Sequence, residues 1–301
     1  NSNVKNYIYL NSLYSLLLDA DKTDAIIGKA EALKRLDIKD KDWIQNYLNT
    51  LKPEVTFINQ LRQKAFEEVH QKPLNLTQKF YSLNLPTGLG KTLTGFSFAL
   101  KLKNELQSAY SIKPRIIYSL PFLSIIDQNA KVLEEVIRTN DITPTSDLIL
   151  KHHHLSDIFY KTEEENYEGD LAKVFIEGWN SEIIITTFIQ LFHSLLSNKN
   201  SMLRRFHKLA NSIIILDEIQ AIPIKYWKIL EEILKVVSEL LNSYIIVMTA
   251  TEPMILNKNK VTLLVNAKDY YNNLNRVNIL SKIREKITLS QLKEELKEEI
   301  L

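Results

Sequence analysis

Apolar residues follow two different spacings along this chain, and these spacings separate strands from helices. From Phe80 onward, short apolar runs rich in β-branched residues alternate with longer stretches whose apolar residues recur every three or four positions. The short runs predict strands over residues 80–85, 115–120, 183–186, 212–216 and 244–248. The longer stretches predict helices over residues 92–106, 123–138, 188–196 and 226–241. This alternation predicts an α/β domain whose mainly parallel sheet is flanked by helices on both faces.

The segments on either side of this domain show helical spacing only. Up to about residue 47 the chain reads as a short helical N-terminal segment, with apolar side chains at Tyr7, Leu10, Leu13, Tyr14, Leu17 and Leu18. A Lys-rich polar stretch then predicts a linker up to Pro53, and a second helix is expected over residues 55–69. The acidic residues 163–170 predict a solvated loop. Near the end, Thr288 and Gln291 form a capping-box pattern for a helix over residues 288–301.

Composition narrows the class of protein. The 301 residues are 45% hydrophobic and 25% charged, which is ordinary for a globular domain and excludes disorder throughout. A net charge of +2 does not identify a nucleic-acid-binding protein, although it is compatible with a local basic groove. The chain has no Cys, no long uninterrupted apolar run and no signal-peptide pattern. We therefore expect a cytoplasmic protein with no disulfide, no thiolate zinc site and no membrane segment.

The strongest chemical signal is a phosphate-binding loop between the first predicted strand of the domain and the helix that follows. It consists of Thr87, Gly88, Leu89, Gly90, Lys91 and Thr92. The glycines let backbone N–H groups turn toward phosphate oxygens, and the helix start adds a partial positive charge. Lys91 would reach the β- and γ-phosphates, and the Thr92 hydroxyl would bind Mg²⁺. The strict motif has Gly where this chain has Leu85, but the Pro-Thr-Gly-x-Gly-Lys-Thr form is the one that helicases use. The alternative is a glycine turn that merely caps a helix.

A second signal is a pair of carboxylates at the end of the strand predicted over residues 212–216. Asp217 and Glu218 follow this buried run, and ligands of open parallel sheets bind beyond the carboxyl ends of the strands. Asp217 is therefore expected near Thr92, where it would hold Mg²⁺, and Glu218 would polarise the attacking water. Burying two carboxylates costs free energy unless a cation or hydrogen bonds compensate. The alternative is a strand that runs into an acidic loop.

Four weaker patterns complete the candidate site. Thr249 and Thr251 follow another apolar run and would hydrogen-bond Asp217 or Gln220. Such a hydrogen bond would couple the segment that contains the two threonines to the state of the nucleotide. Gln60 and Arg62 lie upstream of the loop and are candidates for adenine contacts. Predicted strand ends at Pro121-Phe122 and Thr186-Thr187 are candidates for contacts to a nucleic-acid strand. Like most loops, these two strand ends could equally well have a purely structural role.

Two clusters are interpreted as structural. His152, His153 and His154 are adjacent and therefore point in different directions, and no carboxylate is spaced to complete a metal site with them. The basic residues Arg204, Arg205, His207 and Lys208 predict a solvated basic face, with a nucleic-acid contact as the alternative.

The order of these motifs resembles a known family. Pro-Thr-Gly-Leu-Gly-Lys-Thr, Ser-Leu-Pro-Phe, Thr-Thr-Phe, Asp-Glu-Ile-Gln and Thr-Ala-Thr occur in the order of motifs I, Ia, Ib, II and III of superfamily-two helicases. The fuller runs at residues 119–128, 216–223 and 249–253 are similar to the CRISPR-associated helicase–nuclease of type I systems. That family joins an HD-type nuclease domain to two RecA-like lobes, and it moves along single-stranded DNA with ATP after a crRNA-guided surveillance complex opens the target.

The resemblance implies an organisation and a set of partners. Residues 1–50 resemble the end of an HD nuclease domain plus a linker, residues 51–275 the first, ATP-binding RecA-like lobe, and residues 276–301 a connector toward a second lobe. Because the chain begins at Asn1 and no motif IV, V or VI follows Thr251, we expect a piece of a longer protein. The implied catalytic residues are Lys91, Asp217, Glu218 and Gln220, with ATP and Mg²⁺ as cofactors. The implied partners are single-stranded DNA, the surveillance complex, the second lobe and the HD domain. Gln220 occupies a position where His is expected.

Two other function classes remain open from the sequence. One is a P-loop switch or regulatory nucleotide-binding module, although the Asn-Lys segments at 198–201 and 257–260 lack the Asp that guanine recognition uses. The other is a non-catalytic scaffold that has kept the fold, against which the intact Lys91, Asp217 and Glu218 argue.

Overall fold

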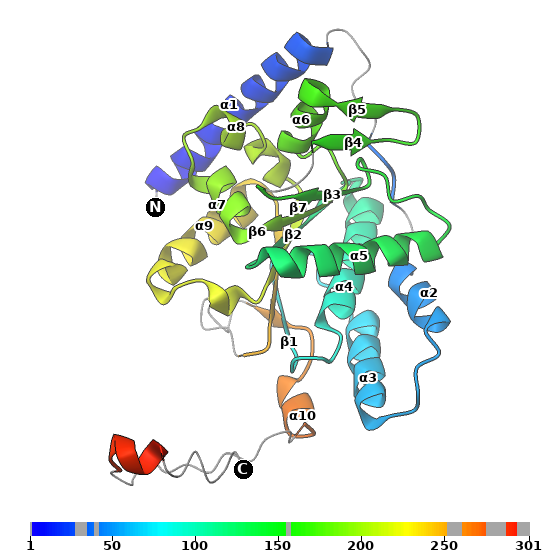
Figure 1. Cartoon of the computed structure of the whole chain (residues 1–301). Helices are drawn as coiled ribbons and strands as arrows, with labels where there is room; N and C mark the ends of the chain where they lie inside the picture. Colours follow the sequence, from blue (N-terminus) through cyan, green and yellow to red (C-terminus); the bar gives the residue numbers. More distant parts are fainter. Residues whose placement is uncertain are drawn as a thin grey trace.

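In the described part of the chain, seven parallel strands form the central sheet, in the order β3-β6-β2-β7-β8-β1-β9. The structure is a computed structural model that describes residues 2–27, 35–38, 42–154, 158–251, 261–274 and 287–293. Helices cover both faces of the sheet (Figure 1). The α/β class expected from the sequence is therefore confirmed. The strands are β1 (Phe80–Asn84), β2 (Arg115–Leu120), β3 (Ile149–His152), β6 (Ile183–Thr187), β7 (Ser212–Asp217), β8 (Tyr244–Thr249) and β9 (Thr262–Leu263).

The five predicted strands are present as β1, β2, β6, β7 and β8, and each ends within one residue of its expected end. Their continuous apolar character follows from burial on both faces. In β7, Ile213 and Ile215 enter the core beneath one helical layer, whereas Ile214 and Leu216 enter the core beneath the other. Every residue of β7 is buried, so an alternating polar pattern would be destabilising there.

Two helical layers enclose the sheet. One face is covered by α2 (Trp43–Thr50), α3 (Phe57–Gln71), α4 (Lys91–Tyr110) and α5 (Leu123–Thr139), with α10 (Ala267–Tyr271) beside α3. The other face is covered by α6 (Gly169–Glu177), α7 (Phe188–Leu196) and α9 (Trp227–Leu240), with α1 (Ser2–Ile27) and the short α8 (Asn200–Leu203) outside them. Among the helices that the structure describes, none has the length and apolar content needed to cross a membrane.

Some elements differ from the sequence prediction. The edge strands β3 and β9 were not predicted, because their apolar runs are short and end in polar residues. The acidic segment 163–170 is only partly a loop: Glu163, Glu164 and Glu165 are exposed, but Asn166–Glu168 forms β5 and pairs with β4 (Phe159–Lys161), and α6 begins at Gly169. Helix α2 spans the end of the predicted helical segment and the start of the predicted linker before Pro53, and its Trp43 and Ile44 are buried against α4 and α5. Its packing moves these residues into the core of the sheet domain.

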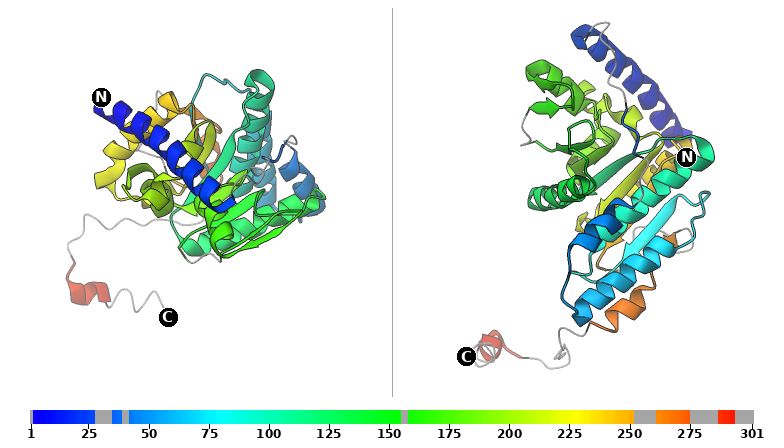
Figure 2. Two further views of the ribbon diagram at one scale, coloured as in Figure 1. Left: turned by 90° about the horizontal axis from the view of Figure 1, so that it is seen from above. Right: turned by 90° about the vertical axis from the view of Figure 1, so that its right-hand side faces the viewer.

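Helix α1 packs on the domain differently from an ordinary amphipathic helix, because many of its large apolar side chains are exposed. It lies across α6, α8 and α9 (Figures 1 and 2). Most of the apolar stripe recognised in the sequence faces away from the domain, with Leu10, Leu13 and Leu17 between 46% and 68% exposed. The inward positions include the buried Ile8 and Ser15 and the half-buried Asp19. The helical period was therefore predicted correctly, but it did not reveal which face packs.

Asp19 anchors α1 through the basic cluster that the sequence placed in solvent. Arg204 Nε donates to Asp19 Oδ1 at 2.8 Å, and Lys208 Nζ lies 3.2 Å from Asp19 Oδ2. Arg204 and Arg205 are 3% and 1% exposed, so the predicted solvated basic face was wrong for them. Removal from water would be costly without partners, and the carboxylate of a distant helix supplies one.

The capping box near the C-terminus is present. Gln291 N donates to Thr288 Oγ1 at 3.3 Å, and Thr288 N donates to Gln291 Oε1 at 2.9 Å. These are the two reciprocal bonds that define the motif. The later part of the predicted helix, residues 294–301, lies outside the described residues.

Candidate active site

A cavity of about 600 Å³ lies beyond the carboxyl ends of β1 and β7. Every residue from Thr87 to Thr94 lines it, together with Asp217 and Glu218. The remaining walls come from α2, α3 and α5, which include Arg62, Gln128 and Asn129. The two sequence motifs that were expected to meet therefore share one cavity, although more than a hundred residues separate them in the chain.

The backbone of the loop has the conformation that its glycines allow. Gly88 and Gly90 have φ angles of 84° and 76°, in the left-handed region that side chains with a Cβ rarely adopt. Helix α4 begins at Lys91, so its unpaired N–H groups and positive dipole end face the cavity. Further along, a Cβ at Gly95 would lie 2.1 Å from Met248 Sδ, so the missing side chain lets α4 pack closely on β8. This close packing fixes the direction in which the helix start points.

Lys91 connects the loop to the second motif. Its Nζ lies 3.1 Å from Glu218 Oε1 and donates to the Leu85 carbonyl at 3.3 Å. Lys91 is 9% exposed, whereas the Glu218 side chain is 29% exposed. The ammonium group is thus held at the cavity wall by one carboxylate and one carbonyl, both of which a phosphate could replace.

Asp217 has one satisfied and one unsatisfied carboxylate oxygen. Tyr118 OH donates to Oδ2 at 2.7 Å, while Oδ1 is buried without a hydrogen-bond partner among the described residues. Burial, together with the nearby Glu218, raises the pKa of Asp217 to about 6, although the Tyr118 hydroxyl and Lys91 act in the opposite direction. A buried carboxylate oxygen with a free lone pair, in a cavity that Thr92 also lines, fits a hard divalent cation such as Mg²⁺.

The raised pKa of Asp217 predicts a pH-dependent gain in stability for Asp217→Asn. Because the folded-state pKa of about 6 lies above the ordinary 3.8, proton binding stabilises the folded protein at low pH, and this contribution is lost as the pH rises through 6. Asn cannot ionise but keeps an acceptor for Tyr118. Relative to wild type, the variant should gain roughly 2 to 3 kcal/mol in unfolding free energy between pH 4 and pH 8. Urea unfolding in EDTA measures this, with the exposed Asp127→Asn as control; equal gains at both pH values would contradict it.

A chain of polar contacts leads from Glu218 to the segment after β8. Glu218 adopts φ 53°, which turns the chain sharply at the end of β7, and Gln220 Nε2 donates to Glu218 Oε2. Thr249 Oγ1 donates to Gln220 Oε1 at 2.7 Å and accepts from Thr251 N–H at 3.0 Å. Of the two partners expected for these threonines, the structure selects Gln220. Gln220 thus contacts Glu218 on one side and Thr249 on the other.

The two candidate adenine contacts differ in position. Arg62 lines the cavity, and its Nε donates to the Gly88 carbonyl at 2.7 Å, which braces the loop. Gln60 is exposed on α3 and does not line this cavity; Asn59 and Gln63 of the same helix do. Of the two residues predicted on this helix, Arg62 therefore faces the cavity and Gln60 does not. Adenine contact remains a prediction for Arg62 and has no support from the position of Gln60.

The predicted nucleic-acid residues are mostly occupied within the protein. Thr186 is completely buried and donates to the His152 carbonyl at 2.8 Å, so it does not reach the surface. The Thr187 hydroxyl accepts from Gln190 N at 3.1 Å and caps α7. Pro121 is half-buried, and the side chain of Phe122 is 59% exposed. Phe122 is therefore the member of this group whose side chain is free to meet a ligand.

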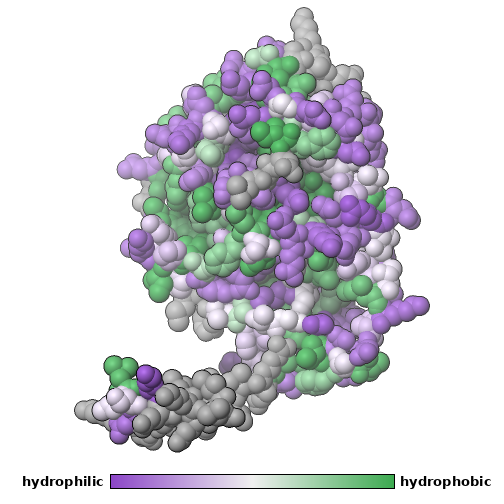
Figure 3. Space-filling model, in the orientation of Figure 1, coloured by the Kyte–Doolittle hydropathy of each residue, from purple (hydrophilic) through white to green (hydrophobic). Residues whose placement is uncertain are grey.

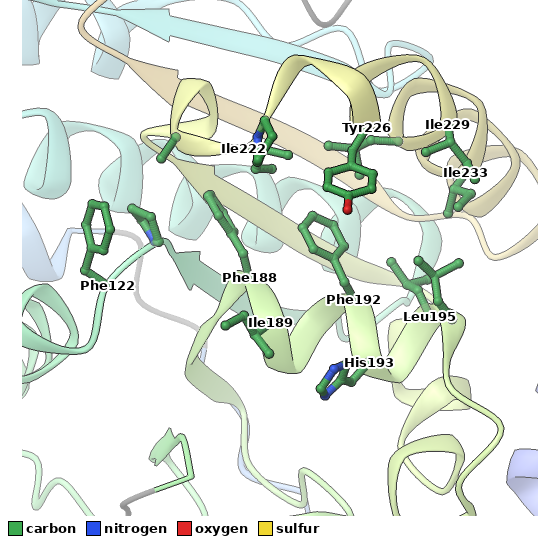
Figure 4. A pocket seen from close by; sticks show the side chains of 15 residues that line it. Phe122, Phe188, Ile189, Phe192, His193, Leu195, Ile222, Tyr226, Ile229 and Ile233 are labelled. Atoms are coloured by element: carbon green, nitrogen blue, oxygen red, sulfur yellow. The ribbon is translucent and has the colours of Figure 1, made fainter.

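Pro121 and Phe122 lie at the mouth of a second, apolar groove of about 530 Å³. Phe188, Ile189 and Phe192 of α7 form one wall, and Ile222 and Tyr226 form part of the opposite wall (Figure 4). Tyr226 and Phe192 point toward each other across it (Figure 4). Hydrophobic residues gather on the surface over α7 and α9 (Figure 3). The groove adjoins the edge at which the cavity lies, but its walls are too apolar to bind phosphate.

Two side chains near Asp217 were not identified from the sequence. Tyr118 stands in the middle of β2 and contacts Asp217, and Asn129 Nδ2 donates to Tyr118 OH at 3.3 Å. Asn129 is buried on the apolar stripe of α5, beside Ile126 and Leu133. A polar residue on a core-facing stripe is the signal that could have revealed it.

His152 of the histidine cluster is buried and hydrogen-bonded within the protein. Trp179 Nε1 donates to His152 Nδ1 at 3.1 Å, and burial together with Arg205 lowers the pKa of His152 to about 3. Among the described residues no group of His, Cys, Asp and Glu side chains has the arrangement of a metal site.

Comparison with known proteins identifies the family. Residues 59–258, which contain the loop, both carboxylates and the Thr-Ala-Thr segment, match the family model of DEAD/DEAH box helicases. The chain belongs to the DEAD/DEAH box helicases. Within this helicase domain, the predicted order of motifs I, Ia, Ib, II and III corresponds to successive loops at one edge of the sheet.

The helicase domain is also similar to CRISPR-associated proteins. The chain is 29% identical over 265 residues to the CRISPR-associated nuclease/helicase Cas3 of Haloferax volcanii, covering 82% of this chain and 28% of that protein. Crystal structures of T. fusca Cas3 with AMPPNP and with ATP superpose with TM-scores of 0.53 and 0.52, at 19% and 21% identity, over 78% and 72% of this chain and 24% and 23% of theirs. The predicted RecA-like helicase fold is thus confirmed. The chain spans about a quarter of the length of these relatives.

Proposed function

We propose that this chain is the first RecA-like lobe of a CRISPR-associated nuclease/helicase, and that it binds and hydrolyses ATP with Mg²⁺ to drive movement along single-stranded DNA. One observation carries the proposal: Lys91 of the loop and Glu218 beyond β7 lie 3.1 Å apart at one cavity, with Asp217 beside them. The ATP-bound T. fusca Cas3 structure supports ATP as the nucleotide.

Nucleotide binding would exchange the partners of Lys91. The loop N–H groups and Lys91 would hold the β- and γ-phosphates, so Lys91 would leave Glu218 for a more highly charged partner. Asp217 and Thr92 would hold Mg²⁺, which supplies neutralising charge to the phosphates during transfer. The freed Glu218 would then orient a water molecule and take its proton as the water oxygen bonds to the γ-phosphorus and the bond to the β-phosphate oxygen breaks.

The change of partners at Lys91 and Glu218 would be transmitted through Gln220 to the segment after β8. Gln220 hydrogen-bonds both Glu218 and Thr249, so a shift of the Glu218 carboxylate changes the contacts of Thr249 and Thr251. This path gives the predicted coupling residues a physical connection to the nucleotide.

Calorimetric titration of the 301-residue chain tests the function directly. ATP should bind in the presence of Mg²⁺ and should compete effectively against GTP, because no guanine-reading Asn-Lys-x-Asp motif is present in the sequence. Equal or tighter binding of GTP would favour the alternative P-loop switch, and absence of any nucleotide binding would favour the scaffold.

Phe122 is proposed to stack on a base of the DNA strand. Stacking of one base on an aromatic side chain contributes about 1–3 kcal/mol, so Phe122→Ala should weaken binding of an unstructured single-stranded DNA by roughly 5- to 150-fold. Fluorescence anisotropy measures the change. Phe57→Ala is a matched control, because Phe57 is 56% exposed on α3. Equal effects of the two substitutions would remove the role assigned to Phe122.

Further parts of the parent protein are proposed as partners. The outward apolar stripe of α1 is typical of a helix that is buried on both sides. An HD nuclease domain, of which α1 would be the last helix, suits this face. A second RecA-like lobe would complete the nucleotide site, and a crRNA-guided surveillance complex would supply the opened DNA. Residues 1–50, 51–275 and 276–301 remain the proposed division of the chain, although α2 packs with the second of these parts.

A further inference from the structure

A buried chain of hydrogen bonds joins the two side chains proposed to hold Mg²⁺. Thr92 Oγ1 donates to Asn129 Oδ1 at 3.4 Å, Asn129 Nδ2 donates to Tyr118 OH at 3.3 Å, and Tyr118 OH donates to Asp217 Oδ2 at 2.7 Å. The four residues come from α4, α5, β2 and β7. Three of them, Asn129, Tyr118 and Asp217, are less than 10% exposed.

The directions of these hydrogen bonds leave oxygen lone pairs of Asp217 and Thr92 available for a cation. A hydroxyl group has one proton, and Tyr118 gives its proton to Asp217 Oδ2 while Thr92 gives its proton to Asn129. Asp217 Oδ1 therefore keeps its lone pairs, and so does the Thr92 oxygen. A hard cation is bound through oxygen lone pairs of this kind.

The polar groups of Tyr118 and Asn129 are not needed to fill the space that these two side chains occupy. Tyr118 is completely buried in β2, where its register partners on β6 and β7 are Ile185 and Ile215. Asn129 occupies a core-facing position of an apolar stripe. A Phe and a Leu would fill the same space without the cost of burying polar atoms. Their polar atoms are satisfied largely by each other and by the two candidate ligands.

We propose that Tyr118 and Asn129 are positioning residues that hold Asp217 and Thr92 in the geometry for Mg²⁺, an inference that rests on the proposed ATP–Mg²⁺ function. They do not touch the ion; they fix the rotamers of the two side chains that do. Residues of this kind typically contribute 10- to 100-fold to metal affinity. The network therefore couples the metal site to β2 and α5, which contain none of the predicted ligands.

Tyr118→Phe tests the proposal, because it removes one hydroxyl and keeps the ring that fills the core. ATP affinity of the 301-residue chain is measured by calorimetry in EDTA and across a Mg²⁺ titration. We expect affinity in EDTA to stay within about twofold of wild type, and the Mg²⁺ concentration for half-maximal enhancement to rise about 10- to 100-fold. Tyr244→Phe is the control, since it removes a hydroxyl that donates to the Leu76 carbonyl elsewhere in the sheet.

Other outcomes separate this inference from the proposed function. An equal loss of affinity with and without Mg²⁺ would show a purely structural role and overturn the inference, as would an unchanged Mg²⁺ titration. Asn129→Ala gives a second test if Tyr118→Phe is unstable to heat, and it should shift the Mg²⁺ requirement in the same direction. Wild-type protein that binds no ATP, or binds it without regard to Mg²⁺, would overturn the proposed function and this inference together.

Discussion

Residues 1–301 alone are expected to bind ATP with Mg²⁺ but to hydrolyse it about 10³- to 10⁵-fold more slowly than a homologue that includes the second RecA-like lobe. The transferring phosphoryl group carries negative charge on three oxygens, and an arginine from outside the loop typically neutralises part of it. Among the described residues that line the cavity, the cationic side chains are Lys91 and Arg62. Arg62 is committed to the Gly88 carbonyl and to Asn59, so it braces the loop and leaves the γ-phosphate to Lys91.

Single-turnover release of phosphate measures this rate, with ATP binding followed in the same sample to show that the site is filled. Single-stranded DNA should raise the rate only slightly, because its contacts cannot supply the missing charge. Arg62→Ala should lower the residual rate together with the affinity, in keeping with a role in the loop. Turnover of the 301-residue chain comparable to that of the longer homologue would refute the need for a residue from another lobe.

The second large effect is expected for Lys91→Ala, which should weaken ATP binding by about 100-fold or more while the fold persists. A hydrogen bond to a charged group contributes about 1.5 to 3 kcal/mol, and Lys91 is proposed to bind two phosphates. The substitution leaves Glu218 without its cation, but Glu218 is 29% exposed and Gln220 still donates to it. The loss of stability should therefore be small compared with the loss of affinity.

Calorimetry with ATP and thermal unfolding without ligand measure the two quantities separately. Lys173→Ala is a suitable control, because it removes an equal charge from the exposed surface of α6, where Lys173 pairs with Glu177. Unchanged affinity of Lys91→Ala would reject the role given to this lysine. Loss of both affinity and cooperative unfolding would instead show that the Lys91–Glu218 pair holds the fold.

Prediction from sequence succeeded where one local pattern has one structural solution. The isoleucine run of β7 can be buried only between two helical layers, and glycines at positions 88 and 90 followed by Lys91 favour one kind of strand-to-helix turn. Strand ends could be located closely because a change from apolar to polar residues marks the sheet edge. The same reasoning missed β9, which has two residues and is held by its neighbour β1 rather than by its own pattern.

Prediction from sequence failed where a side chain could have found its contacts either in solvent or in several parts of the protein. Apolar spacing identified α1 as a helix, yet its polar side faces the domain because Asp19 finds Arg204 and Lys208 there. Arg204 and Arg205 looked solvated because their partners are remote in sequence. Thr186 and Thr187 looked available for ligands, but the His152 carbonyl on the adjacent strand β3 and the Gln190 N–H in α7 use their hydroxyls.

The sequence alone determined the α/β class and the order in which the motifs follow the strands. It also determined that Lys91 lies near the carboxylates at the end of β7, because parallel strands present their carboxyl ends on one edge of the sheet. Only the tertiary structure decided that Tyr118 and Asn129 support Asp217, that Gln63 rather than Gln60 lines the cavity, and which face of α1 packs. Hydrophobic periodicity encodes how much of an element is buried. Hydrogen-bond partners depend on distances of a few ångströms between segments that are far apart in the chain, and no local pattern records those distances.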